Sequence, residues 1–150
     1  WTDPDLRLVL LGGRGAAEAE VAADIVRLGL ERRVIRPGRV PDAHRDGLIA
    51  AADALVFPSQ YEGFGAPAVE AMALGTPVIC SDQPALAEVA GDAGLVLPLD
   101  VDAWADALDT VAARADEMCS AGRTRARAFS TERSGAELAA AYELAVRIGR

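Results

Sequence analysis

The chain has 150 residues, of which 51% are hydrophobic, and it carries 23 acidic against 15 basic residues for a net charge of -8. About 150 residues suffice for one domain that buries roughly 70% of the surface its unfolded chain exposes. The negative charge argues against nucleic acid as a partner, because proteins neutralise phosphate backbones with Lys and Arg. All of the basic residues are arginine, so no lysine ammonium is available for binding or catalysis.

The cysteine content and the apolar patterning bear on the compartment. Cys80 and Cys119 lack the spacing of a zinc site or a disulfide framework, so we expect free thiols in a reducing cytosol. The sequence contains no run of about 18 apolar residues and does not begin with a signal-peptide pattern. We therefore expect a cytoplasmic protein without a membrane-spanning segment.

Short apolar runs alternate with segments of helical spacing through the first hundred residues. The expected strands are Leu6–Leu11, Val34–Ile35, Ala54–Phe57, Pro77–Cys80 and Leu95–Leu97. Most of these runs are too continuous for a strand with one wet face, so we expect buried parallel strands. Helices are predicted over 16–28, 42–52 and 67–74, and only helices follow Asp100. The alternation predicts an α/β fold, a doubly wound parallel sheet with helices on both faces, and a helical C-terminal segment.

The loop between the third predicted strand and the helix at 67–74 has the composition of a ligand-binding turn. Gly63 and Gly65 flank Phe64 and permit unusual dihedrals and a close backbone approach. Pro67 suits the first helical position and Gly75 suits the residue just past the helix end. Ligands of such sheets bind at the carboxyl ends of the strands, where loop N–H groups and a helix N-terminus form an anion site.

Two carboxylates accompany this loop. Glu62 lies in the loop itself, and Glu70 lies about one turn inside the helix. Carboxylates accept charge-assisted hydrogen bonds from hydroxyls, in which sugars and ribose are rich. The spacing alone equally allows Glu70 to complement the helix dipole and Glu62 to be a solvated loop residue. The single histidine, His44, and Glu88 have no partner in a recognisable motif, and we interpret both as structural.

Residues 58–78 contain the pattern Pro-Ser-x-x-Glu-Gly-Phe-Gly-x-Pro-x-x-Glu-Ala-Met-Ala-x-Gly-Thr-Pro-Val. This pattern closely resembles the family 4, or group 1, retaining glycosyltransferases of the GT-B fold, and the likeness continues through residues 8–13 and 81–94. The resemblance implies that residues 1–150 form a nucleotide-sugar-binding domain. It also implies that Glu62 is the catalytic residue and contacts hydroxyls of the donor sugar, and that Glu70 holds the ribose hydroxyls.

The resemblance implies further contacts with the donor. The backbone around the Gly-Phe-Gly turn is expected to reach the transferred sugar and the diphosphate, through Gly63, Phe64, Gly65 and Ala66. Arg39 and Val40 are expected to border the nucleobase, with a solvated loop arginine as the competing interpretation. Members of this type generally work without a metal, so we expect no metal and no other cofactor. The implied partners are a nucleoside diphosphate sugar and a sugar or lipid-linked acceptor.

The sequence also departs from the family pattern. Members carry an N-terminal acceptor domain and a further first strand and helix with an Arg and a Lys that hold the diphosphate, and we expect this chain to lack both units and to be inactive alone. Phe129-Ser130-Thr131-Glu132 resembles the family's Phe-Ser-Trp-Glu with Thr131 in place of the aromatic residue, so Leu138 and Tyr142 on the last helix are expected to face water.

Four further expectations concern assembly, location, Arg14 and alternative functions. Exposed sheet or helix surface suggests self-association as a hypothesis, and the full-length parent is expected either in the cytosol or peripherally at the cytoplasmic membrane face. Arg14 follows the first strand in a glycine-containing turn without the dinucleotide-binding pattern, and we interpret it as solvated. The alternatives to a transferase domain are a non-catalytic binding or assembly module and another GT-B enzyme, such as a nucleotide-sugar epimerase.

Overall fold

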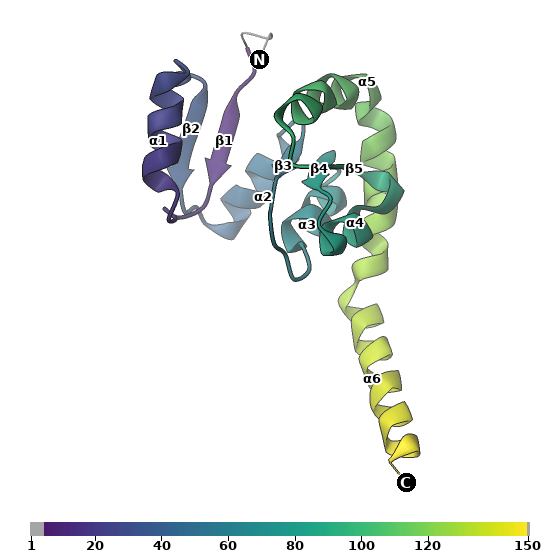
Figure 1. The fold of residues 1–150 in the computed structure, drawn as a ribbon. Coiled ribbons are helices and arrows are strands. Elements are labelled where there is room, and N and C mark those ends of the chain that lie inside the picture. The colour runs from purple at the N-terminus through teal and green to yellow at the C-terminus, as the bar shows by residue number, and fades with distance from the viewer. Residues whose placement is uncertain (1–4, 150) are drawn as a thin grey trace. The chain divides into compact units, whose positions relative to one another are not determined.

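The computed structural model describes residues 5–149, so the first residues, on which the expected absence of a signal peptide rests, lie outside its description. The chain divides into two compact units, Trp1–Gly47 and Leu48–Arg150. The elements in chain order are β1 (Leu8–Leu11), α1 (Glu18–Arg27), β2 (Val34–Gly38), α2 (Asp42–Ala50), β3 (Leu55–Phe57), α3 (Ala66–Leu74), β4 (Val78–Ser81), α4 (Pro84–Ala90), η1 (Gly91–Ala93), β5 (Leu95–Leu97), α5 (Val101–Ala126), η2 (Arg127–Phe129) and α6 (Thr131–Ile148). Figure 1 shows these elements.

The first unit is built on two parallel strands. β1 pairs with β2 through the registers Leu8↔Val34 and Val9↔Ile35. α1 connects them and is followed by Gly29, whose φ of 66° is accessible to glycine and whose N–H donates to Val26 O at 3.0 Å. The expected burial of these strands on both faces is wrong, since Val9 is 37% and Ile35 50% exposed. A two-stranded sheet whose crossover supplies one helix has cover for only one of its faces.

The second unit contains a three-stranded parallel sheet in the order β3-β4-β5. β4 is central and every residue of it is buried, as expected for a strand covered on both faces. Val78 and Cys80 belong to a core cluster with residues of α3 and α4, whereas Ile79 belongs to a second cluster with residues of α5. Because neighbouring side chains on a strand point to opposite faces, helices cover this sheet on both sides. The predicted α/β class with parallel strands is confirmed, and the strands form one sheet in each unit.

α5 contributes side chains to both layers of the second unit, and it bends along its length. Arg114 has non-helical dihedrals, with φ −121° and ψ 16°. Before the bend, Ala107 and Val111 pack in the Ile79 cluster. After it, α5 runs along α3, where a Cβ built on Gly122 would stand 3.3 Å from Met72 Cγ. The glycine thus permits the close approach of the two helices, and the bend is visible in Figure 1.

α6 extends from the end of η2 as an exposed helix. Ser130 caps it, and its hydroxyl accepts a hydrogen bond from Arg133 N at 3.2 Å. Leu138 and Tyr142 are 56% and 67% exposed, so the expectation that they face water is confirmed. Within residues 5–149, no helix combines the length and the apolar character needed to cross a membrane.

Candidate functional site

The predicted binding loop lies at the carboxyl edge of the second unit's sheet. It spans residues 58–65 between the end of β3 and the start of α3. Because β3, β4 and β5 are parallel, the segments that follow them emerge at the same edge. Asp82 N, just past β4, donates to Leu97 O at the end of β5 at 2.9 Å. This edge is where open α/β sheets bind ligands.

Two serines tie Glu62 to the sheet. The Ser81 hydroxyl, at the end of β4 and fully buried, donates to the carbonyl of Ser59. The Ser59 hydroxyl in turn lies 3.2 Å from Glu62 Oε1 and 3.1 Å from Tyr61 O, and its one hydrogen serves either acceptor. Glu62 is half-buried. Its carboxylate is therefore positioned from the central strand.

Gly65 sets the entry into α3. Its φ of 95° and ψ of 42° place it in the left-handed region, which glycine adopts without steric penalty. A Cβ on Gly65 would stand 2.5 Å from Leu86 Cδ2, so the loop backbone lies directly on α4. The helix begins at Ala66, one residue earlier than predicted, so Pro67 is the second helical residue and not the first. Helix geometry leaves the N–H groups of Gly65 and Ala66 without intrahelical acceptors.

Glu70 lies in the middle of α3 and is half-buried. It stands four residues after Ala66, which corresponds to about 6 Å along the helix axis. The two predicted carboxylates thus belong to the same unit, one in the loop and one on the helix that the loop starts. Carboxylates are groups that accept hydrogen bonds from hydroxyls.

Arg39 and Val40 belong to the first unit, and the Glu62–Glu70 segment belongs to the second. Gly12 N donates to Gly38 O at 3.1 Å, which joins the turns that follow β1 and β2. A Cβ on Gly13 would stand 3.1 Å from Arg39 Nε, so the Arg39 side chain lies along this turn. The neighbouring Arg14 has an 88% exposed side chain, 3.7 Å from a Glu18 carboxylate oxygen, in accord with the solvated turn expected for it.

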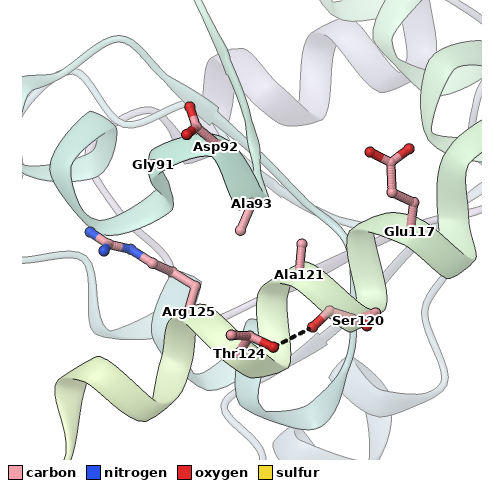
Figure 2. A pocket seen from close by; sticks show the side chains of 8 residues that line it. All are labelled: Gly91, Asp92, Ala93, Glu117, Ser120, Ala121, Thr124 and Arg125. Atoms are coloured by element: carbon pink, nitrogen blue, oxygen red, sulfur yellow. Dashed lines mark hydrogen bonds between the residues drawn. The ribbon is translucent and has the colours of Figure 1, made fainter.

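A hollow elsewhere on the second unit contains none of the predicted site residues. Figure 2 shows its lining from η1 and from α5 beyond the bend: Gly91, Asp92, Ala93, Glu117, Ser120, Ala121, Thr124 and Arg125. The hollow is open to solvent, and the Arg125 side chain lies along its wall. Its charged residues, Asp92, Glu117 and Arg125, are of mixed sign and do not form the positively charged surface that would attract a nucleotide.

Neither serine of the Glu62 support was singled out from the sequence. Ser81 is a polar residue at the carboxyl end of an otherwise apolar run. Its position at the ligand-binding edge of the expected sheet is the signal that could have identified it. Leu86 was missed as well, since its contact with Gly65 joins two helices that follow different strands. Cys80 lies one residue before Ser81, and burial raises the pKa of its thiol to about 11, so it is no candidate nucleophile.

Comparison with known proteins identifies the family. The family model described as "Glycosyl transferases group 1" matches residues 2–114. The O-antigen chain mannosyltransferase B of Escherichia coli is 51% identical over 98 residues, which are 64% of this chain and 26% of that protein. The chain thus spans about a quarter of this relative's length.

Solved structures share the fold. Sucrose-phosphate synthase of Thermosynechococcus elongatus superposes with a TM-score of 0.84 at 30% identity, over 95% of this chain and 39% of that one. The Anabaena protein HepE, solved in complex with UDP, superposes with a TM-score of 0.76 at 26% identity, over 96% of this chain and 42% of that one.

Proposed function

Because the chain belongs to the group 1 glycosyl transferases, we propose that it binds a nucleoside diphosphate sugar as the donor-binding, C-terminal domain of a retaining sugar transferase. The similar Anabaena protein was solved with UDP, and the similar Escherichia coli protein is a mannosyltransferase. These likenesses support a hexose donor and a sugar or lipid-linked acceptor. The acceptor is held by a part of the parent protein that the matched relatives have in addition to this region.

The observation that carries the proposal is the geometry of Gly65. Its left-handed backbone turns the chain into α3 at the carboxyl edge of the sheet, with Leu86 packed beneath it. In the proposed complex, the N–H groups of Gly63, Phe64, Gly65 and Ala66 face the diphosphate. A helix N-terminus carries about half a positive charge, so it stabilises a phosphate without a basic side chain.

The carboxylates divide the donor between them in this proposal. Glu70 accepts hydrogen bonds from the ribose hydroxyls, and Glu62, held by Ser59, accepts them from the sugar. Departure of the diphosphate leaves positive charge on the sugar ring, and a fixed carboxylate nearby stabilises that charge. Glu62 is therefore the proposed catalytic residue, and transfer proceeds with retention at the sugar carbon. The loop's N–H groups take up the charge of the leaving diphosphate, so no metal is required.

A calorimetric titration tests the proposal. The chain is titrated with UDP, GDP and ADP, and with their glucose or mannose derivatives at up to millimolar concentration. Loss of a hydrogen bond to a charged group costs about 1.5–3 kcal/mol, so Glu70→Gln is expected to weaken every nucleotide about tenfold or more. Glu62→Gln is expected to weaken the nucleotide sugar and leave the bare nucleotide unchanged. Glu88→Gln, at an exposed carboxylate on α4, is the matched control.

Three outcomes contradict parts of this proposal. Equal weakening of the bare nucleotide by Glu62→Gln and Glu70→Gln would remove the division of roles between them. Binding that vanishes in EDTA and returns with Mg²⁺ would refute metal independence. No saturable binding by this chain or by its full-length parent would favour a non-catalytic assembly module with the same fold.

A further inference from the structure

The ring of Phe64 links the proposed donor loop to the C-terminal part of the chain. Its centroid lies 5.7 Å from that of Phe129 in η2, with the planes at 72° in an edge-to-face arrangement. Phe64 is 50% exposed, so the hydrophobic core does not by itself fix its position. The contact with Phe129 therefore restrains the tip of the loop.

Phe129 is itself held against α4 by an arginine. The guanidinium carbon of Arg125 lies 5.0 Å from the centre of the Phe129 ring, within the range of a cation–π contact. Arg125 Nε donates to Val89 O at 3.0 Å, and its Nη2 donates to Glu88 O. One planar guanidinium thus bridges two carbonyls at the end of α4 and contacts the ring of Phe129.

A residue of α4, Leu86, contacts the same loop. Leu86 packs under Gly65, where a Cβ would stand 2.5 Å from its Cδ2. The Phe64–Gly65 peptide is consequently held at two points, on Leu86 directly and on the end of α4 through Phe129 and Arg125. Both supports belong to the second unit and lie outside the loop.

We propose that Phe129, held by Arg125, is a positioning residue for the donor loop: it fixes the Phe64 ring and with it the N–H groups that face the diphosphate. This role rests on the proposed donor site. Phe129 does not contact the proposed ligand and acts through Phe64. Preorganisation lowers the cost of ordering the loop when a ligand binds, so the effect appears in nucleotide affinity as well as in the mobility of the unliganded loop.

The loop is first measured without ligand. In the ¹⁵N-labelled chain, amide relaxation of Gly63, Phe64 and Gly65 is compared between the parent sequence and Phe129→Ala. We expect their order parameters to fall and the amides of β3, β4 and β5 to keep their chemical shifts. Phe129→Tyr, which keeps the ring edge, is expected to restore the order. Tyr142→Ala removes an exposed aromatic ring of α6 and is the matched control.

Affinity for UDP and GDP supplies the second measurement. Loss of one aromatic pair corresponds to roughly a three- to tenfold weakening, which we expect for Phe129→Ala and not for Phe129→Tyr. Arg125→Lys keeps the charge and loses the bridging fork, so it is expected to loosen the loop in the same direction. Arg127→Lys in η2 is its control.

The outcomes separate this inference from the proposed function. If Phe129→Ala leaves the loop's order parameters unchanged, the positioning role is wrong whether or not nucleotides bind. If the unsubstituted 150-residue chain binds neither UDP nor GDP, the proposed donor site is wrong. The relaxation data still decide whether Phe129 positions the loop. Should Phe129→Ala not fold, Phe129→Leu and Arg125→Lys provide the same comparison in folded chains.

Discussion

The guanidinium of Arg123 lies over Gly75, where a Cβ would stand 2.3 Å from Arg123 Cζ. Gly75 ends α3 with φ 85°, and its N–H donates to Met72 O at 3.1 Å. The next N–H, of Thr76, reaches back to Ala71 O at 2.8 Å, which is the paired bonding of a Schellman motif. A cation at the carboxyl end of a helix also offsets the helix dipole.

Gly75→Ala is therefore expected to destabilise the chain by about 1–2 kcal/mol through its left-handed backbone, with some added cost for displacing Arg123. Urea unfolding followed by circular dichroism measures the change. Gly135→Ala in α6 is the control, since a Cβ there meets no atom within 4 Å. A helical Gly→Ala change is expected to be neutral or stabilising, so equal destabilisation by both would contradict the role of Gly75.

The two glycines of the proposed donor loop are expected to respond differently to the same substitution. A Cβ at Gly65 meets Leu86 at 2.5 Å with φ 95°, whereas a Cβ at Gly63 meets nothing within 4 Å. Gly65→Ala should shift the loop off α4 and weaken nucleotide binding at least tenfold, and Gly63→Ala should retain most of it. Calorimetry on both variants checks this. Similar losses of affinity in the two variants would show that the left-handed backbone of Gly65 and its contact with Leu86 do not determine nucleotide binding.

The caps of α5 and α6 provide a comparison of global and local stability. Asp100 Oδ1 accepts from Ala103 N at 3.0 Å, and Ser130 caps α6 in the same way. Asp100→Ala is expected to lower the free energy of unfolding by about 1 kcal/mol, because α5 carries core residues. Ser130→Ala is expected to speed amide exchange in α6 without that global change, because α6 buries no residue. Equal shifts in the urea midpoint would contradict this difference.

The Cys80 thiol predicts a pH dependence. Burial raises its pKa from 9.0 to about 11, so the folded chain holds this proton more tightly than the unfolded chain does. Its contribution to stability is complete below pH 9 and is lost as the pH rises from 9 to 11. The difference in unfolding free energy between the parent chain and Cys80→Ala should shrink over this interval. Iodoacetamide at pH 8 should modify the half-buried Cys119 first.

Much of the fold was predictable because local patterns coincide with tertiary ones. The strand at 95–97 was predicted with its observed bounds, and Gly29 and Gly75 end their helices as expected. β2 was predicted too short, since Pro37 and Gly38 disfavour strands and yet extend this one to Gly38. The exposure of β1 and β2 was not predictable, because the sequence of an apolar strand does not determine how many helices cover it.

The residues of the candidate site could be predicted from the sequence, but the contacts that hold them in place could not. The placement of Glu62, Gly65 and Glu70 around one turn follows from short-range spacing and is observed. The contacts that hold this turn join residues far apart in sequence: Ser81 to Ser59, and Phe129 to Phe64. No periodicity encodes such pairs. The proposed roles of the carboxylates, and of Arg39 and Val40, stay predictions until a ligand is bound.

The part of α5 that follows the bend at Arg114 has a consequence for how the second unit unfolds. Met118 packs with Ile79 on one face of the sheet, and Ala121, less than one turn later, packs on the cluster of the opposite face. Fraying this stretch of helix uncovers both layers together, so neither layer can melt alone. The sheet and its two covers should form a single cooperative unit, with the slowest-exchanging amides of β4 and of residues 115–122 opening at one common rate.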